Sequence, residues 1–118
     1  MDNQKTNIKK GAMKMLVMTL LNESDMYGYE IMQKLSERSD GIIEIKEGAL
    51  YHLLYKLEEN KYVTTYKKTV NIRRERVYYH LEESGKELLA QIKTDYDEIS
   101  NGISRILSWS EENQTKNK

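Results

Sequence analysis

The chain has 118 residues, of which 38% are hydrophobic and 32% are charged, and it contains neither cysteine nor proline. Its length suits one domain, and the absence of cysteine excludes disulfide bonds and thiol catalysis. The chain has 19 basic residues (lysine and arginine) and 19 acidic residues (aspartate and glutamate), so its formal net charge is zero. No apolar run reaches the ~20 residues that span a membrane, and no signal-peptide cleavage pattern is present. The sequence therefore predicts a cytoplasmic protein with no membrane partner.

The charges are unevenly distributed along the chain. Residues 1–80 contain 14 basic and 11 acidic residues, whereas residues 81–118 contain five basic and eight acidic ones. A local excess of positive charge attracts phosphate over about one Debye length, roughly 10 Å. Between positions 61 and 80 a single acid, Glu75, stands against six basic residues: Lys61, Lys67, Lys68, Arg73, Arg74 and Arg76. This stretch indicates either a nucleic-acid contact or a solvated basic hairpin.

Two helices are expected in the first third of the chain. The first covers about residues 8–21, and its second half is apolar on nearly every side, so we expect a second subunit to cover part of it. The second covers about residues 26–38. Ser24 or Asp25 is its expected N-cap, and Gly41 is expected to take the left-handed position just past its end.

Residues 42–45 are too few for more than a connector or an edge strand, and a third helix is expected over residues 47–59. Its inner stripe has the i, i+3, i+4, i+7 spacing of a buried face: Leu50, Leu53, Leu54 and Leu57. The opposite face offers hydrogen-bonding side chains in place of the usual lysine and glutamate: Gly48, Tyr51, His52, Tyr55 and Lys56. Such side chains donate to phosphate and to base edges. The alternatives are that Tyr51 borders the core and that Tyr55 packs under the element that follows.

A β-hairpin is expected next, from strands at residues 62–67 and 74–81 with Asn71 near the turn. The second strand alternates, with Val77, Tyr79 and Leu81 on one face and Arg74, Arg76, Tyr78 and His80 on the other. Three helices followed by a hairpin make a winged helix. In such a domain the third helix enters a major groove and the hairpin rests on the flanking phosphates.

A long helix over about residues 84–110 completes the expected fold. Its apolar positions alternate in steps of three and four, as in a coiled-coil seam that needs a partner helix. We therefore expect a homodimer held by two helices, through Leu16 and Leu20 of the first and Leu89, Ile92, Tyr96, Ile99, Ile103 and Ile106 of the last. The expected organisation is a DNA-binding domain at 8–82, a dimerisation helix at 83–110, and flexible ends at 1–7 and 111–118. The fold class is mainly α: a three-helix winged helix-turn-helix, a two-stranded β-hairpin wing and a long C-terminal dimerisation helix.

Catalytic and metal sites are not expected. The only histidines, His52 and His80, lie on separate elements and have no acidic or cysteine partner at ligand spacing. The sequence also lacks a glycine-rich phosphate loop and a nucleophile elbow. We therefore predict a protein that is not an enzyme and that holds no metal and no cofactor.

Three motifs in order resemble the PadR family of bacterial transcriptional regulators, in its short form with one C-terminal helix. They are Tyr27-Gly28-Tyr29-Glu30-Ile31, Glu47-Gly48-x-Leu50-Tyr51-x-x-Leu54 and Arg76-x-Tyr78-Tyr79-x-Leu81-x-x-x-Gly85. The resemblance implies a homodimeric repressor on an inverted-repeat operator of double-stranded DNA, released by a small aromatic or drug-like effector. The resemblance assigns Tyr51 to the recognition helix and Arg73, Arg74 and Arg76 to the basic wing.

The chain departs from the family pattern at two positions of the third helix. Ala49 stands where many members have threonine, and His52 stands where many have proline. A hydroxyl is therefore missing and a titratable donor is present, which puts any operator sequence taken from relatives in doubt. The complete set of expected DNA contacts is Gly48, Ala49, Tyr51, His52, Tyr55, Lys56, Lys67, Lys68, Arg73, Arg74 and Arg76.

Three alternatives stay open at the level of sequence. Tyr96, the only aromatic residue in the seam of the long helix, is the expected effector contact, or else it only packs in the seam. The winged helix could instead grip a protein without reading DNA sequence, although such a module has no need of a basic hairpin. A dimer that mainly sequesters a ligand is the third possibility, and operator binding by the free protein separates it from a sensor.

Overall fold

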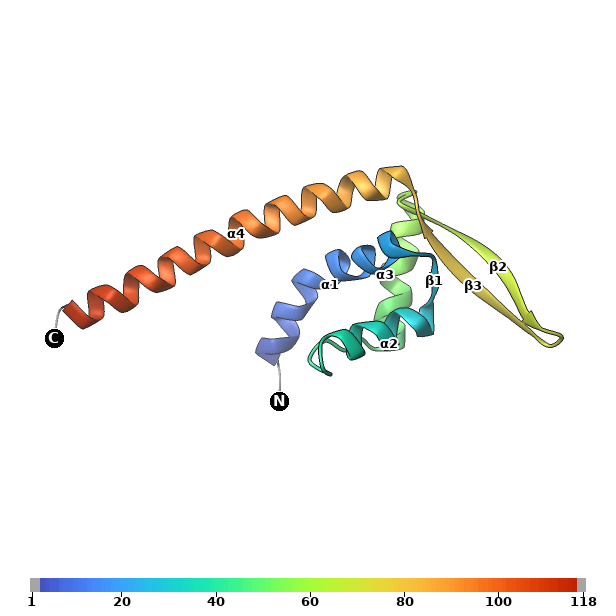
Figure 1. Ribbon diagram of the computed structural model, residues 1–118, viewed down its shortest axis with the longest axis horizontal. Helices are drawn as coiled ribbons and strands as arrows, with labels where there is room; N and C mark the ends of the chain where they lie inside the picture. The colour runs from blue at the N-terminus through green and yellow to red at the C-terminus, as the bar shows by residue number, and fades with distance from the viewer. Residues whose placement is uncertain (1–2, 117–118) are drawn as a thin grey trace.

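In the computed structural model, each helix and strand described below contributes at least one buried apolar residue to one hydrophobic core. The structure describes residues 3–116, and the side chains of residues 8–114. The elements along this part of the chain are α1 (Asn3–Glu23), β1 (Met26–Tyr27), α2 (Gly28–Arg38), α3 (Glu47–Glu59), β2 (Val63–Asn71), β3 (Arg74–Leu81) and α4 (Glu83–Lys116). Figure 1 shows α1, α2 and α3 grouped together, with the β2–β3 hairpin projecting to one side and α4 running away on the other. The winged-helix prediction is confirmed.

The core is centred on three leucines of α3. Leu50, Leu54 and Leu57 are at most 2% exposed, and the fourth residue of the stripe, Leu53, is half-buried against them. Each fully buried leucine contributes about 1.5–3 kcal/mol through the hydrophobic effect. The bounds expected for this helix, residues 47–59, match the observed ones. The leucine spacing therefore determined both the position of α3 and the side that it turns inward.

The second helix begins later than expected, because residues 26 and 27 form a short strand. Met26 and Tyr27 pair antiparallel with Tyr79 and Tyr78 of β3, so the sheet has the order β1-β3-β2 and three strands, not two. Met26 is fully buried, and its strand conformation places that side chain in the core. The predicted N-cap, Ser24 or Asp25, was wrong. Tyr27 is the N-cap of α2, and its side chain makes no capping hydrogen bond.

The end of α2 follows the prediction more closely. The helix ends at Arg38, and both Asp40 (φ 53°) and Gly41 (φ 80°) adopt the left-handed conformation. The Gly41 N–H donates to the Ser36 carbonyl over 2.8 Å, which closes the turn. Residues 42–45 are a connector without strand pairing.

Both ends of the chain are more helical than expected. Residues 3–7 belong to α1 and residues 111–116 to α4, so the two helices extend into the segments that were expected to be flexible ends. Residues 1–2 and 117–118 lie outside the described part. The reason is that polar residues do not stop a helix in the absence of proline or a helix-ending glycine. Helix α4 has 34 residues and a length of about 50 Å at 1.5 Å per residue.

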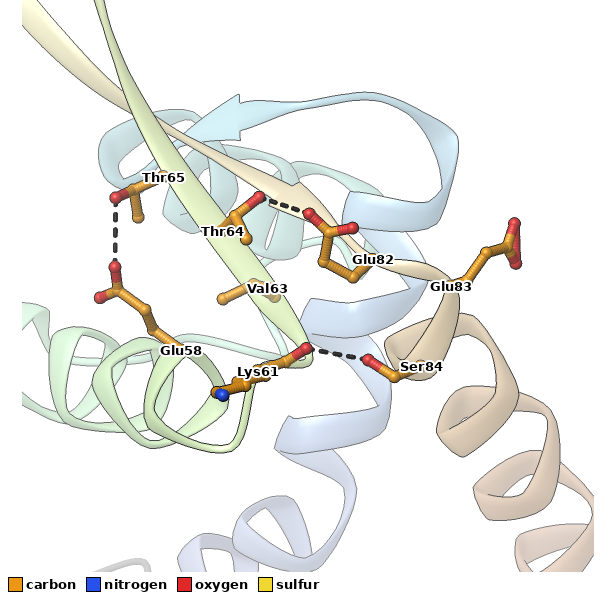
Figure 2. Close-up of a pocket in the computed structure, with 8 residues that line it drawn as sticks. All are labelled: Glu58, Lys61, Val63, Thr64, Thr65, Glu82, Glu83 and Ser84. Carbon is orange, nitrogen blue, oxygen red and sulfur yellow. Dashed lines mark hydrogen bonds between the residues drawn. The ribbon is translucent and has the colours of Figure 1, made fainter.

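The base of the wing is bound to the helices by three side-chain hydrogen bonds, which Figure 2 shows together. Thr65 donates to Glu58 of α3 over 3.1 Å, and Thr64 donates to Glu82 over 2.7 Å. The Ser84 hydroxyl donates over 2.8 Å to the carbonyl of Lys61, a residue with φ of 65° in the turn after α3. The first two contacts tie β2 to α3 and to the residue that follows β3, and the third ties the turn before β2 to the start of α4. They fix the direction in which the wing leaves the domain.

Helix α4 approaches the sheet closely at Gly85. This residue is buried, and a Cβ placed there would overlap the backbone carbonyl of Tyr62 and the side chain of Leu81. The carbonyl belongs to the turn that holds the wing and cannot move independently of it. The third family motif therefore ends in glycine because no side chain fits between α4 and this turn.

We expect the substitution Gly85→Ala to destabilise the fold by about 1–3 kcal/mol, because the methyl group overpacks a site lined by backbone. Thermal or chemical unfolding measures this loss. Gly102→Ala is the matched control, since nothing lies within 4 Å of a Cβ at that position of the same helix. There the substitution should stabilise α4 slightly through the better helix propensity of alanine. Equal effects at both sites would contradict the assigned role of Gly85.

Candidate nucleic-acid interface

The solvent face of α3 presents the residues expected from the sequence. Gly48, Ala49, His52 and Lys56 are exposed, and Tyr55 is 61% exposed. The large exposed fraction of Tyr55 excludes the alternative that this ring packs under the wing. The face therefore presents a phenol, an imidazole and an ammonium group directed away from the core.

Tyr51 lies at the edge of this face and contacts the start of α2. Its side chain is 41% exposed, and its hydroxyl and ring cover Gly28 so closely that a Cβ at position 28 would overlap them. The alternative that Tyr51 borders the core is thus partly correct. The ring packs across the α2–α3 corner while part of it remains in solvent. The pairing also explains two family motifs together, because the glycine of the first makes room for the tyrosine of the second.

The wing carries its basic residues on both faces and at its tip. In the β2–β3 ladder Lys67 lies opposite Val77, and Lys68 lies opposite Arg76. Arg73 follows the turn, where its N–H donates to the Asn71 side chain over 3.0 Å, so the expected role of Asn71 as a turn former is confirmed. All the basic residues from Lys67 to Arg74 are exposed, and Ile72 between them is fully exposed. The tip therefore offers cations and one apolar side chain to a partner.

Two of the expected DNA-contacting cations already have aromatic partners within the chain. The Arg76 guanidinium lies 4.2 Å from the ring centre of Tyr27, and the Lys68 ammonium lies 5.4 Å from that of Tyr78. The Tyr78 ring in turn stacks on Tyr66 at 5.6 Å and meets Tyr27 edge-on at 5.5 Å. Cation–π contacts hold the charges in place without neutralising them. The three tyrosines therefore support two of the basic side chains of the wing, Lys68 and Arg76.

Asp25 connects this aromatic cluster to α1. Its Oδ2 accepts a hydrogen bond from the Tyr66 hydroxyl over 2.7 Å, and its Oδ1 lies 2.8 Å from His80 Nδ1. Partial burial raises the pKa of Asp25, but the hydrogen bonds from His80 and Tyr66 outweigh it, and the net pKa lies below the usual aspartate value. The hydrogen bond to Asp25 also raises the pKa of the Tyr66 hydroxyl. Asp25 therefore stays ionised and supports the wing instead of capping α2.

Sequence reasoning missed Asp25, Tyr27 and Tyr66 as supports of the wing. Asp25 and His80 are 55 positions apart, and Asp25 and Tyr66 are 41 apart. No local spacing links residues at such separations. The only available signal was the alternation that placed Tyr78 and His80 on the outer face of β3.

The residues expected at a dimer seam fall into two groups. Leu20 and Leu89 are 5% and 2% exposed within the chain's own core, and Leu16 and Ile92 are half-buried beside it. Beyond the core, α4 carries an apolar stripe that is at least half exposed: Tyr96, Ile99, Ile103, Ile106 and Leu107. The surface open to a partner is therefore this stripe, which we call the α4 stripe, and Leu20 and Leu89 serve the core of the single chain.

Two other classes of site are absent from the described residues. No group of three or more histidine, aspartate or glutamate side chains in residues 8–114 is arranged to hold a metal ion. Over the described helices, none is both long and apolar enough to cross a membrane.

The comparison with known families matches the stretch from the second half of α1 to the first turns of α4. The model of the transcriptional regulator PadR-like family matches residues 17–91. The chain belongs to this family. It is a DNA-binding transcriptional regulator of the PadR type and not an enzyme, as the sequence predicted.

The chain is also similar to individual proteins, among them solved structures of transcriptional regulators. An uncharacterised protein of Lysinibacillus sphaericus is 30% identical over 95 residues, which cover 80% of this chain and 87% of that protein. A transcriptional regulator from Clostridium thermocellum superposes with a TM-score of 0.78 at 27% identity, covering 84% of this PadR-like chain and 93% of the other. Bacillus subtilis PadR in complex with operator DNA superposes with a TM-score of 0.62 at 25% identity. The superposition covers 67% of this chain and 45% of the Bacillus subtilis chain.

We expect Gly28→Ala to displace the Tyr51 ring and to lower DNA affinity, while its effect on stability stays within about 1–3 kcal/mol, because the exposed ring can move toward solvent. Combining Gly28→Ala with Tyr51→Ala should recover the stability that the first variant loses, since the added methyl then meets empty space. Thermal melting of the wild type, both single variants and the double variant measures this coupling. Strictly additive effects would show that the methyl group added at position 28 does not meet the Tyr51 ring.

Proposed function

We propose that this PadR-like chain is a homodimeric repressor that binds an inverted-repeat operator, with α3 of each subunit in a major groove and each wing on the adjacent backbone. The observation that carries the proposal is the α3 face. Tyr55 and His52 point to solvent there, Tyr51 is positioned by Gly28, and a basic wing stands beside them. Bacillus subtilis PadR, a structural relative, is known in complex with operator DNA. Such a role calls for a cytoplasmic location, where the operator is accessible.

The exposed α4 stripe supports the proposal of a dimer. Figure 1 shows the C-terminal half of α4 extending beyond the rest of the chain without packing on another element. Ile99, Ile103 and Ile106 follow each other at steps of four and three, which is the spacing of a coiled-coil seam. Pairing this stripe with its copy in a second subunit buries it and relates the two α3 helices by a two-fold axis, as an inverted repeat requires.

Release by a small aromatic effector is part of the proposal. Tyr96 is 50% exposed at the start of the α4 stripe, one helical turn after Ile92, which packs half-buried against the core. In a dimer it would stand between the two DNA-binding domains. A flat compound stacked there could change the spacing of the α3 helices.

The operator is found by in-vitro selection of DNA bound by the wild-type protein, with the fragment upstream of its own gene as one candidate. The proposal expects selected duplexes to share two related half-sites about one helical turn apart. Selection of no common sequence, together with binding that does not depend on salt, would instead favour a winged helix that grips a protein.

Replacing both Arg73 and Arg74 with alanine should weaken binding to all sequences to a similar degree, because phosphate contacts carry no sequence information. The slope of log K against log salt should shrink by up to about 0.9 for each phosphate that the variant no longer neutralises. Fluorescence anisotropy at several salt concentrations measures both. Arg105→Ala on α4 is the control for removal of charge alone. An altered sequence preference with an unchanged slope would mean that the wing reads bases.

The substitution Ile103→Glu should convert the dimer into a folded monomer, because it places an unpaired charge in the seam while Ile103 makes no part of the core. Asn101→Glu on the opposite side of the same helix turn should leave the dimer intact. Sedimentation velocity gives the mass and circular dichroism confirms the helix content. A wild-type protein that sediments as a monomer at micromolar concentration would refute the dimer.

A further inference from the structure

A basic cleft that no pattern in the sequence indicates lies on the side of α3 away from the wing. It has a volume of about 710 Å³ and lies between the N-terminal half of α1, the connector after α2 and the first turns of α3. Its floor is apolar, formed by Met13, Ile45 and Leu53, which are buried or half-buried. Figure 1 shows the N-terminal end of α1 and the wing on opposite sides of α3.

Four lysines surround this cleft: Lys9, Lys10 and Lys14 of α1, and Lys46 directly before α3. Lys10 and Lys14 are four residues apart on one helix, so their charges repel each other. Among the residues with described side chains, the ion pairs include none of these lysines, and the only acid lining the cleft is Glu44. Four positive charges beside one negative charge repel one another, and this repulsion is reduced when a polyanion binds.

The position of the cleft identifies the polyanion. His52 lines the cleft and also belongs to the solvent face of α3, so the lysines stand immediately beside the surface proposed to enter a major groove. A helix in that groove has a phosphate backbone on each side, about 12 Å apart across the groove. The wing supplies cations on one side, and the cleft lysines supply them on the other.

We propose that Lys10, Lys14 and Lys46 bind the DNA backbone that borders the major groove on the side opposite the wing. This inference rests on the proposed function, and it adds a second, sequence-independent contact to it. Without that contact, each domain would be held by the wing at one edge of α3 only. With it, the backbone is held on both sides, and the lysines help to set how deeply α3 enters the groove.

The test compares two double variants that each remove two exposed cations: Lys10→Gln with Lys14→Gln in the cleft, and Lys93→Gln with Arg105→Gln on α4. Glutamine keeps most of the side-chain stem, and Lys9 and His52 are left unchanged because Lys9 is half-buried and His52 belongs to the α3 face. Affinity is measured from 50 to 300 mM salt on the selected operator and on an unrelated duplex of equal length, after equal melting temperatures have been confirmed.

The cleft variant should bind both duplexes roughly five- to tenfold more weakly at about 0.1 M salt for each lysine–phosphate pair it removes, and its salt slope should shrink by about 0.9 per pair. The α4 variant should match the wild type. A second measurement needs no variant: single uncharged methylphosphonates on the operator should weaken wild-type binding at phosphates on the side away from the wing. The same methylphosphonates should not weaken binding by the cleft variant any further.

The outcomes separate this inference from the proposed function. If the Arg73 and Arg74 variant loses affinity while the cleft variant and the methylphosphonates have no effect, the cleft inference is wrong and the proposed function stands. If the wild type binds neither duplex, both are wrong. Calorimetric binding of inorganic phosphate at these lysines, with DNA affinity unchanged by Lys10→Gln and Lys14→Gln, would assign the cleft to a free anion and also overturn the inference.

Discussion

Burial of the leucine stripe of α3 is the constraint on which the rest of the structure depends. Leu50, Leu54 and Leu57 are almost completely removed from solvent, and this determines the rotation of α3 about its axis. Each residue along a helix turns by about 100°, so a shift of one position would bury Tyr51 or Tyr55 and expose a leucine. The loss of one buried leucine, about 1.5–3 kcal/mol, is a large part of the stability of a small domain. The solvent face of α3 is therefore a consequence of its buried face.

The wing and α2 are then positioned against this fixed helix. Gly28 gives space to Tyr51, and Glu58 at the end of α3 accepts a hydrogen bond from Thr65 of the wing. On the outer face, Tyr27 and Asp25 from the segment before α2 hold Arg76 and Tyr66 of the hairpin. The basic side chains of the wing are thus presented by a braced hairpin instead of a free one. A braced hairpin loses less conformational entropy when it binds a phosphate backbone.

Helix α4 serves two purposes along its length. Its first turns belong to the core, where Leu89 is buried and Gly85 lies against the turn at Tyr62 that precedes the wing. Its C-terminal half exposes the α4 stripe. One continuous helix joins both regions, and its first turn contacts the turn before the wing through Ser84, which donates to the Lys61 carbonyl. This continuity gives a physical route from the proposed effector contact at Tyr96 to the DNA-binding face.

The sequence alone determined α3 and its two faces, the hairpin and the long helix, because each depends on a periodicity of near neighbours. It also identified the family through three motifs. Only the tertiary structure decided the rest. Met26 and Tyr27 form a strand and not the start of the second helix, because they pair with β3. Asp25 binds Tyr66 and His80, which are 41 and 55 positions away. Leu20 and Leu89 are buried in the core, and Lys46 lies beside the lysines of α1 in the cleft. The sequence could not predict either feature, because contacts between distant segments leave no periodic signal.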